Sequence, residues 1–559
     1  MPKLTGAEAL IESLKEEGVE HIFGIPGGAM IDVYDVLYDE EEIDHILTRH
    51  EQGAAHAADG YARVTGKPGV CMATSGPGAT NLTTGLANAN MDSSPVIAIT
   101  GQVPKSLLGV DAFQEADILS TMLPNTKHNF MLRDASKIPE KVNYGFKVAT
   151  TGRPGPIHMD FPKDVQNAEA EVEIPTEAEY DKELRLEPDE KEIQEAVELL
   201  AEADQPLIFA GGGVVLSEAW PELREFAKSL NIPVTTSTMA KGVIPEDDPL
   251  SLGIMGMHGR MTANIAITEC DVLFGIGVRF DDRQTGDIKH FAPNAEIIHV
   301  DIDPVEIGKN VRVDVPIQGD AKLTLKEMNE YVKSNSISRS PDQWNERIEK
   351  LRDQFEPKMD YDEKPIKPQR IIKEAMDVLN DDAIITAEVG QCQMWAAHFY
   401  EMKKPRRFVN SGGLGTMGFG FPAAIGAKVG KPDSQVVDIA GDGSFLMNSQ
   451  ELATVVENDI PVVVAIFDNR CLGMVKQWQD LFYDERRAST LLGETPDFVK
   501  LAESYGAYGD RIVRPSEIAP KFKDALESGK PAVLDIVIDP DEHVLPMVPA
   551  GGKLDKMLT

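Results

Sequence analysis

The chain has 559 residues, 42% of them hydrophobic, which is too long for a single core and suggests about three domains. Asp and Glu number 92 against 55 Lys and Arg, a formal charge of −37, which argues against binding to nucleic acid or to anionic membrane surfaces. Such acidity also suits a protein that works at high salt, a hypothesis that flat activity and melting temperature from low to molar KCl would exclude.

Cysteine usage and the N-terminal sequence bear on the compartment. Four cysteines without a CxxC pair argue against a disulfide framework or a zinc site and fit a reducing setting. The first residues lack the apolar core of a signal peptide, and no stretch approaches the roughly 18 apolar residues of a membrane span. We therefore expect a cytoplasmic protein.

The first part of the chain alternates helices and strands. Thr5 and Glu8 form a capping-box pattern that predicts a helix ending at Gly18. Three strands are predicted after it, at residues 21–25, 70–74 and 95–100. This alternation is typical of a parallel sheet flanked by helices. The unit is predicted to close near residues 161–164, and an acidic connector with prolines follows at 167–187.

Glu51 stands at the head of an Ala-rich helix, directly after an apolar stretch that resembles a strand. A Glu in the first turn of a helix is usually a solvated charge that complements the helix dipole. The other interpretation is that this carboxyl group is catalytic. Residues elsewhere in the chain are needed to distinguish the two interpretations.

A second unit repeats the helix and strand pattern. An amphipathic helix has its apolar face at Ile193, Ala196, Val197 and Leu200, and strands are predicted at residues 206–210, 272–276 and 297–301. Rossmann-like folds bind nucleotides where such strands end. No GxGxxG is present, so a nucleotide site and plain βα turns both stay open. A polar segment at 333–368 is predicted as the next linker.

The third unit carries the most specific motif. An apolar strand at residues 436–440 runs into Gly441-Asp442-Gly443-Ser444, and a second strand at 461–467 ends in Asp468-Asn469. The glycines let the backbone approach a ligand closely, and a helix N-terminus there favours phosphate. Mg²⁺ prefers oxygen ligands and is usually shared with substrate phosphate, so Asp442 and Asn469 suffice as side-chain ligands. A glycine-rich βα turn without a ligand is the alternative.

This segment resembles the thiamine diphosphate (ThDP) motif, in which GDG is followed after about 25 to 30 residues by NN; here Asp468 replaces the first Asn. The resemblance gives Glu51 a role. In ThDP enzymes a carboxyl group bonded to the pyrimidine ring favours the imino tautomer that activates the cofactor, while the cofactor carries the carbanion chemistry.

Nearly the whole chain resembles the catalytic subunits of acetohydroxyacid (acetolactate) synthases, a ThDP-dependent family. Several further segments match that family: residues 24–29, 74–78, 111–115, 161–166 and 415–418. Two departures are small. Ile25 stands where Tyr is common, and Arg470-Cys471-Leu472 stands where relatives are more polar, which affects only the main-chain ligand of the metal.

The resemblance implies an α/β fold of three doubly wound parallel-sheet domains. These are an N-terminal pyrimidine-binding domain at residues 1–166, a central Rossmann-like domain associated with FAD at 188–335, and a diphosphate- and magnesium-binding domain at 366–559. In this family ThDP lies between the first domain of one subunit and the third domain of another. Glu51 and Asp442 are therefore expected to meet across a dimer interface.

The resemblance also implies roles for individual residues. Glu51, Gly28 and Gln114 are expected near the reacting atoms. The expected cofactor-binding residues are Glu51, Pro77, Met417, Gly441, Gly443, Ser444 and Met474 for ThDP, and Arg279 and Asp301 for FAD. The expected substrate-pocket residues are Phe113, Lys163, Arg283 and Trp478, and the expected metal ligands are Asp442, Asn469 and the main chain at Cys471.

The implied reaction is the decarboxylation of pyruvate and the addition of the resulting hydroxyethyl carbanion to pyruvate or 2-oxobutanoate. The products, 2-acetolactate and 2-aceto-2-hydroxybutanoate, begin valine, leucine and isoleucine biosynthesis. ThDP, Mg²⁺ and a largely structural FAD are the expected cofactors. A homodimer or homotetramer with a small regulatory subunit is the expected assembly.

Three other interpretations remain. A pyruvate oxidase, a pyruvate decarboxylase or a catabolic acetolactate synthase would use the same ThDP residues. Residues 279–283 and 544–549 resemble the FAD-binding, anabolic type instead. A dehydrogenase built on the middle domain leaves Glu51, Asp442 and Asn469 without a role, and intact ThDP residues argue against a non-catalytic scaffold.

Overall fold

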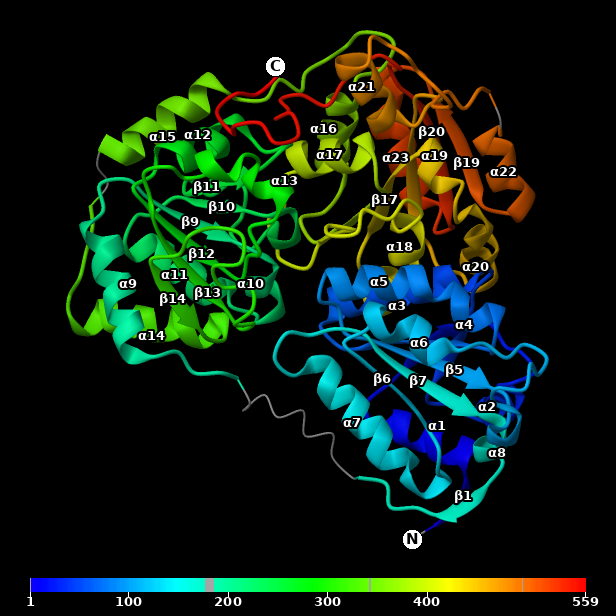
Figure 1. Ribbon diagram of the computed structural model, residues 1–559. Helices are drawn as coiled ribbons and strands as arrows, with labels where there is room; N and C mark the ends of the chain where they lie inside the picture. The colour runs from blue at the N-terminus through cyan, green and yellow to red at the C-terminus, as the bar shows by residue number, and fades with distance from the viewer. Residues whose placement is uncertain (1, 176–184, 341–342, 495) are drawn as a thin grey trace.

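The computed structural model describes residues 2–175, 185–340, 343–494 and 496–559. These residues form three six-stranded sheets and one two-stranded ribbon. Neighbouring strands are parallel throughout the large sheets, as chains of alternating strands and helices require. Figure 1 shows each sheet covered by its own helices, in three lobes that contact one another. The predicted α/β class with three doubly wound domains is confirmed.

The first domain has the strand order β3-β2-β4-β5-β7-β6. Its strands are β2 (His21–Gly24), β3 (Asp44–Leu47), β4 (Gly69–Ala73), β5 (Val96–Gln102), β6 (His128–Met131) and β7 (Ile157–Pro162). Its helices are α1 (Gly6–Glu16), α2 (Ile31–Tyr38), α3 (Glu51–Thr65), α4 (Pro77–Asn81), α5 (Thr83–Met91), α6 (Ile118–Met122), α7 (Ile138–Thr150) and α8 (Lys163–Gln166). The predicted capping box is present, because the Glu8 amide donates to Thr5 Oγ1 at 3.2 Å and the Thr5 amide to Glu8 Oε2 at 2.7 Å.

A short antiparallel ribbon ties the ends of this domain together. Strand β1 (Lys3–Thr5) pairs with β8 (Glu169–Glu171). Strand β8 lies inside the segment predicted as an acidic connector at 167–187, so the connector begins with a paired strand. Residues 176–184 of that connector lie outside the described residues.

The middle domain has the strand order β11-β10-β9-β12-β13-β14, which is 3-2-1-4-5-6 when its strands are numbered along the chain, the Rossmann order. Its strands are β9 (Pro206–Ala210), β10 (Val234–Thr236), β11 (Ser251–Ile254), β12 (Val272–Ile276), β13 (Glu296–Asp301) and β14 (Val315–Gln318). Its helices are α9 (Glu190–Glu202), α10 (Gly212–Leu216), α11 (Trp220–Ser229), α12 (Met261–Glu269), α13 (Asp282–Thr285), α14 (Ala321–Ser334) and α15 (Gln343–Gln354). The apolar face predicted for α9 is buried in this core.

Helix α15 corrects one prediction. It lies inside the polar segment 333–368 that the composition predicted as a linker. Trp344, Ile348 and Leu351 are buried in the core of the middle domain, and the Trp344 indole donates to the carbonyl oxygen of Pro206 at 3.0 Å. Their helical spacing was the signal that the high polarity of the segment concealed.

The third domain has the strand order β16-β15-β17-β18-β20-β19, the same path as the first domain, since both read 2-1-3-4-6-5 along the chain. Its strands are β15 (Ile384–Ala387), β16 (Phe408–Asn410), β17 (Val436–Gly441), β18 (Val463–Asp468), β19 (Tyr508–Ile512) and β20 (Ala532–Val537). Its helices are α16 (Pro368–Val378), α17 (Gln391–Phe399), α18 (Gly420–Gly430), α19 (Asp442–Phe445), α20 (Leu452–Glu457), α21 (Gly473–Phe482), α22 (Phe498–Tyr505) and α23 (Ile518–Glu527).

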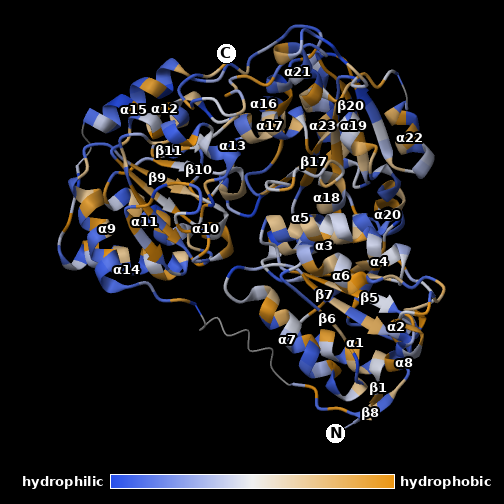
Figure 2. Cartoon of the chain, viewed as in Figure 1, coloured by the Kyte–Doolittle hydropathy of each residue, from blue (hydrophilic) through white to orange (hydrophobic). Residues whose placement is uncertain are grey.

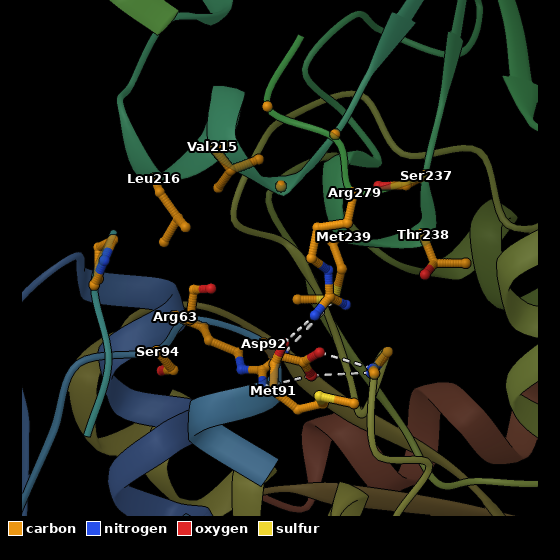
Figure 3. Close-up of a pocket in the computed structure, with 18 of the residues that line it drawn as sticks. Arg63, Met91, Asp92, Ser94, Val215, Leu216, Ser237, Thr238, Met239 and Arg279 are labelled. Carbon is orange, nitrogen blue, oxygen red and sulfur yellow. Dashed lines mark hydrogen bonds and ion pairs between the residues drawn. The ribbon is translucent and has the colours of Figure 1, made fainter. Parts of the chain in front are cut away.

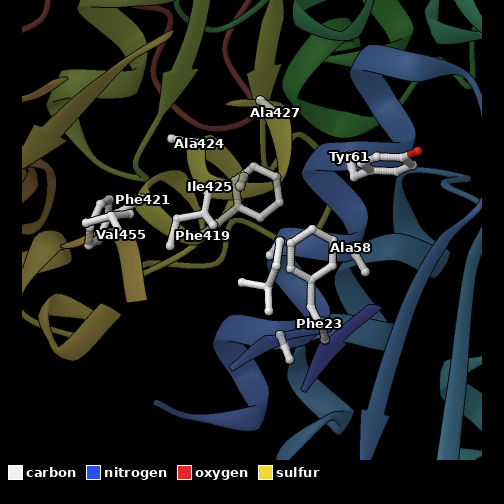
Figure 4. Packing of buried hydrophobic residues seen from close by; sticks show 14 of the residues in the cluster. Phe23, Ala58, Tyr61, Phe419, Phe421, Ala424, Ile425, Ala427 and Val455 are labelled. Atoms are coloured by element: carbon white, nitrogen blue, oxygen red, sulfur yellow. The ribbon is translucent and has the colours of Figure 1, made fainter. Parts of the chain in front are cut away.

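Helices α3 and α18 join the first and third domains. A Cβ atom added to Gly60 would stand 2.2 Å from the Ala423 carbonyl oxygen, and one added to Gly426 would stand 1.8 Å from that of Ala57. Figure 4 shows the apolar side chains around this crossing, and one buried cluster contains residues of both domains. The two domains therefore share a core, and Figure 2 shows hydrophobic residues gathered there and on the sheets.

All four cysteines are buried and unbridged, as their spacing suggested. Within the ranges that the structure describes, no helix is both long enough and apolar enough to cross a membrane.

Candidate active site

Three helices of the third domain begin at one edge of its sheet. Strands β15, β17 and β18 are neighbours, and α17, α19 and α21 start after them at Gln391, Asp442 and Gly473. The N-cap residues of α17 and α21, Gly390 and Leu472, provide no side-chain hydrogen bond. The three helix N-termini surround a small cavity of about 60 Å³. Because backbone N–H groups at helix N-termini attract anions, this edge suits a diphosphate group.

The predicted diphosphate and metal residues lie together in this cavity. Its lining includes Met417, Gly441, Asp442, Gly443, Ser444, Asn469, Cys471 and Met474. Strand β17 delivers the first part of the motif, and β18 ends at Asp468, one residue before Asn469. The motif is assembled because β17 and β18 pair in parallel and therefore end at the same edge.

Buried oxygen atoms provide the candidate metal donors. The Asp442 carboxylate accepts the Gly443 amide at 2.9 Å, and burial, followed by the neighbouring Asp468 carboxylate, raises its pKa above the usual range. The Asn469 amide nitrogen donates to Gln391 Oε1 at 3.1 Å, and the Asn469 Oδ1 accepts the Cys471 amide at 3.3 Å. A bound cation would favour ionised Asp442. The oxygen donors fit Mg²⁺.

The described part of the chain contains no cluster of three His, Cys, Asp or Glu side chains able to hold a metal. A cation at Asp442 and Asn469 therefore needs main-chain or ligand oxygen atoms to complete its shell, as Mg²⁺ shared with a phosphate does.

Met417 lies in the loop between β16 and α18, with Gly415 and Gly418 at φ +72° and +87°. Buried Glu388 holds this loop, accepting the amides of Gly418 at 2.7 Å and Phe421 at 3.1 Å. Met417 lines the small cavity and also a much larger one beside it. A flexible thioether at this junction can fill an irregular gap beside a cofactor.

The larger cavity has a volume of about 1100 Å³ and lies where all three domains meet. Strands β9, β12 and β13 end at it, and Gly211, Gly277, Arg279 and Asp301 are among its lining residues. Ligands of Rossmann folds bind at this end of the strands. Burial raises the pKa of Asp301 to about 6. The position and the size of this cavity agree with the hypothesis, drawn from the sequence, of a nucleotide site in the middle domain.

Residues of the first and third domains complete this cavity. Arg63 donates to Asp92 Oδ2 at 3.0 Å, and Asp92 also accepts the amides of Gly412 at 3.0 Å and Gly413 at 2.7 Å. Arg279 of the middle domain donates to the Met91 carbonyl oxygen at 2.7 Å, and Figure 3 shows Arg63, Asp92 and Arg279 converging from their two domains. Arg63 and Asp92 were not predicted from the sequence, because no local pattern marks a contact between domains.

Two predicted substrate-pocket residues meet in the same cavity. The Arg283 guanidinium lies over the Trp478 ring, 5.9 Å from its centroid, and both residues line the cavity. Arg283 comes from α13 of the middle domain and Trp478 from α21 of the third. A cation and an aromatic face here can bind a small acid with an apolar tail.

The remaining predicted residues gather at the carboxyl edge of the first domain. Glu51 is the first residue of α3, and its Oε2 accepts a hydrogen bond from the Asn81 side-chain amide at 2.9 Å. A Cβ atom added to Gly78 would lie 3.3 Å from Glu51 Oε1. Pro77 is the first residue of α4, and its neighbour Gly76 faces the Gln114 carbonyl oxygen, which would be 2.8 Å from an added Cβ atom.

Gln114 and Phe113 occupy an exposed loop of this domain. Gln114 has φ +59°, and Phe113 is 88% exposed. The Lys163 ammonium donates to the Gly28 carbonyl oxygen at 2.7 Å and lies 3.4 Å from Asp32. Phe113 and Gln114 therefore lie at the surface of a single chain, outside both cavities.

The structure thus divides the predicted residues of one chain into two sets. The first-domain set is Glu51, Gly28, Pro77, Phe113, Gln114 and Lys163, and none of these lines either of the two cavities among the described residues. The second set, from the middle and third domains, lines the cavities.

Gln391 and Gly390 are two further residues of the site that were not predicted from the sequence. Both line the small cavity, and Gln391 Nε2 also donates to Gln477 Oε1 at 2.8 Å. A signal existed, because the buried run of β15 is followed by a glycine and a helix, the pattern that marked residues 436–444.

Comparison with known proteins agrees with this architecture. The chain matches the N-terminal TPP binding domain of thiamine pyrophosphate enzymes at residues 4–121, their central domain at 193–328 and their C-terminal TPP binding domain at 388–536; thiamine pyrophosphate is another name for ThDP. It is 57% identical to a probable acetolactate synthase large subunit of Methanocaldococcus jannaschii, over 99% of this chain and 95% of that protein.

Two further relatives are similar over most of their lengths. Identity is 48% with the acetolactate synthase large subunit of Corynebacterium glutamicum, over 98% of this chain and 89% of that protein. It is 43% with the acetolactate synthase isozyme 3 large subunit of Escherichia coli, over 100% and 99%. The chain therefore belongs to the acetolactate synthase large subunits, a family of thiamine pyrophosphate enzymes.

Proposed function

We propose that this protein joins pyruvate to a second 2-oxo acid, with loss of CO₂, to form 2-acetolactate from pyruvate or 2-aceto-2-hydroxybutanoate from 2-oxobutanoate. These products begin the biosynthesis of valine, leucine and isoleucine. The observation that carries the proposal is the meeting of Asp442, Asn469 and three helix N-termini beside a cavity that contains Arg283 and Trp478.

The residues of the small cavity suit Mg²⁺ and the diphosphate group of ThDP by their chemistry. Asp442, Asn469 and the main chain at Cys471 would hold Mg²⁺. Gly441, Gly443 and Ser444 leave room and offer donors for the diphosphate, and Met417 and Met474 line the same space. ThDP, when bound, supplies an electron sink for the electrons left by the loss of CO₂ from pyruvate.

Residues of this chain would handle the protons and the substrate. Asn81 holds Glu51 Oε2, which leaves Oε1 to exchange a proton with the cofactor's pyrimidine ring. Gln114 would donate from its amide to developing negative charge on the substrate oxygen, a contribution of about 3 kcal/mol where such donors are preorganised. Lys163 fixes the Gly28 carbonyl group at 2.7 Å and so orients the loop beside it.

Arg283 and Trp478 would select the second substrate. Arg283 suits the carboxylate of a 2-oxo acid, and the ring beneath it suits the added methylene of 2-oxobutanoate. Such a contact is worth about 1 to 3 kcal/mol, so the preference is expected to be about 10- to 200-fold.

FAD is proposed for the large cavity as a structural cofactor. The cavity volume of about 1100 Å³ exceeds that of most drug-sized sites. Basic and acidic side chains both line this cavity, among them Arg279 and Asp301 at the carboxyl ends of the Rossmann strands. A lining that offers both donors and acceptors at this end of the strands suits the phosphates and the ribose of a dinucleotide.

A second copy of the chain is proposed to complete each site. Glu51 lies outside the cavity that Asp442 lines, and Phe113 is 88% exposed. Met447 at 50% and Leu491 at 63% are exposed apolar side chains of the third domain. A homodimer, alone or within a tetramer, would cover such side chains and bring Glu51 of one copy to the diphosphate site of the other.

Three further proposals concern the partner subunit, the compartment and the domain boundaries. A small regulatory subunit is proposed because relatives are named large subunits. We place the enzyme in the cytoplasm, where four unbridged thiols are stable. The functional domains are proposed at residues 1–166, 188–335 and 366–559.

The test incubates the purified chain with pyruvate, ThDP, Mg²⁺ and FAD and measures acetolactate. Glu51→Gln is expected to lose at least about 100-fold in rate, the usual range for a positioned proton-transfer group. Glu190→Gln, at an exposed Glu in the first turn of α9, is the matched control and should stay at the parent rate. Acetaldehyde or acetyl phosphate as the main product would overturn the proposal.

A further inference from the structure

Glu451 is a buried carboxylate that the proposed mechanism does not use. It lies in the third domain, directly before α20, and its exposed fraction is 0%. A carboxylate in such a place is costly unless its oxygen atoms are hydrogen-bonded. The groups that donate hydrogen bonds to Glu451 therefore indicate its role.

The partners of Glu451 belong mostly to the first domain. The Arg49 amide donates to both carboxylate oxygens at 3.1 Å, and the His50 amide donates to Oε1 at 3.0 Å. Within its own domain, the Thr454 hydroxyl donates to Oε2 at 2.6 Å. Main-chain N–H groups from another domain thus satisfy most of this charge.

Arg49 and His50 are the two residues before Glu51, where α3 begins. The N-terminal N–H groups of a helix have no partner within the helix and need one from outside. The His50 ring accepts the Gln52 amide at 3.1 Å, and Glu451 accepts the two amides that precede Glu51. The backbone on the N-terminal side of Glu51 is therefore fixed by a residue of the third domain.

The first turn of α3 is shaped to admit this carboxylate. A Cβ atom added to Gly53 would stand 2.6 Å from Glu451 Oε1, so a side chain at residue 53 would displace the Glu451 carboxylate. Further along the same helix, Gly60 packs against Ala423 of α18, where an added Cβ atom would stand 2.2 Å from its carbonyl oxygen. The packing with α18 fixes the body of α3, and Glu451 fixes its first turn.

The side-chain charge of Arg49 is engaged elsewhere. Its guanidinium pairs with Glu457, whose side chain is 63% exposed, and donates to the Leu47 carbonyl oxygen at 2.8 Å. Glu451 and Glu457 therefore contact the same residue in different ways. Glu451 holds the Arg49 backbone and Glu457 holds its side chain at the surface.

We propose that Glu451 is the positioning residue of Glu51. By accepting the Arg49 and His50 amides across the domain boundary, it sets the direction in which the Glu51 carboxyl group points from α3. The inference rests on the proposed function, because Glu51 needs a defined direction only if it exchanges a proton with ThDP. A reacting group displaced by about 1 Å can lose about 100-fold in rate.

The test compares Glu451→Gln and Glu451→Ala with Glu457→Gln in the full-length chain. Gln keeps one acceptor oxygen of similar shape, Ala keeps none, and Glu457→Gln weakens only the surface contact to the Arg49 side chain. Should Glu451→Ala fail to fold, Glu451→Gln still decides, because it preserves volume.

The first readout is amide hydrogen exchange at residues 49–53 without cofactors. Exchange is expected to rise at least tenfold in Glu451→Ala, by a smaller factor in Glu451→Gln, and not at all in Glu457→Gln. The second readout is the rate at which bound ThDP exchanges its thiazolium proton for deuterium, which needs Glu51 but no pyruvate. That rate is expected to fall about tenfold or more in the same order, with ThDP affinity within twofold of the parent.

Faster amide exchange with an unchanged thiazolium exchange rate would overturn the inference, because Glu451 would then be a structural contact only. Unchanged amide exchange in both Glu451 variants would overturn it as well. A parent chain that exchanges the thiazolium proton with the predicted dependence on Glu451, yet makes no acetolactate, would support the inference and refute the proposed function, so the two can fail separately.

Discussion

Replacing Asp160 with Asn removes a buried titrating group of the first domain while keeping its shape. The carboxyl group lies in β7, where Oδ1 accepts the Thr100 hydroxyl and Oδ2 accepts the Gln102 side-chain amide, both at 3.0 Å. Gln102 also donates to the Ala116 carbonyl oxygen at 3.3 Å, beside the loop that carries Gln114. Burial raises the pKa of Asp160 from 3.8 to about 7.

The size of the effect follows from this pKa. The folded chain keeps a proton on Asp160 up to about pH 7, whereas the unfolded chain loses it near pH 3.8. The protonated carboxyl group therefore contributes stability that is fully present below pH 3.8 and is lost as the pH rises through 7. Over the whole range this amounts to about 4 kcal/mol, of which about 2.5 kcal/mol is lost between pH 5 and 8.

The assay is denaturant unfolding of the parent and of Asp160→Asn at pH 5 to 8. The parent's advantage in free energy of unfolding over the variant is expected to fall by about 2.5 kcal/mol across that range. Asp39→Asn, at an exposed carboxylate after α2, is the control and should show a constant difference. A difference between the parent and Asp160→Asn that is constant within about 0.5 kcal/mol would refute a raised pKa.

Two further predictions concern the domain contact and the substrate pocket. Gly426→Ala would place Cβ 1.8 Å from the Ala57 carbonyl oxygen and is expected to lower the free energy of unfolding by about 1 to 3 kcal/mol or more, which is measured as a lower melting temperature. Gly529→Ala is the control, because it has open space around it but φ +64°. It should lower the free energy of unfolding by only about 1 kcal/mol. Trp478→Leu is expected to lower the preference for 2-oxobutanoate over pyruvate about tenfold, measured by competition between the two acceptors, and an unchanged product ratio would exclude Trp478 from the acceptor pocket.

Local patterns predicted the sheets, and they predicted that the residues of the third-domain motif lie together. The run at residues 436–444 needed only neighbouring residues to define a strand, a tight turn and a helix start. Its candidate ligands Asp442 and Asn469 come together because β17 and β18 pair in parallel, which βα alternation makes the default. The same reasoning gave β9 and β12 their observed bounds.

Contacts between domains were beyond the reach of the sequence. The bonds from Asp92 to the amides of Gly412 and Gly413 join segments far apart in the chain, and no local period marks such a pair. Glu451 is another example, since it reads as an ordinary helix-flanking Glu until the Arg49 amide is seen to bind it. Helix α15 was predicted as part of a linker because most of its residues are polar. Its three buried apolar residues are too few to stand out in that composition.

The most direct test of the account mixes two inactive variants, Glu51→Gln and Asp442→Asn, so that their subunits exchange, and measures acetolactate formation. If each site takes Glu51 from one copy and Asp442 from the other, a mixed dimer has one intact site. Random exchange between equal amounts should then restore about a quarter of the parent activity. No restoration in mixed dimers isolated by two different tags would contradict the account, because both residues would then serve a site within one chain.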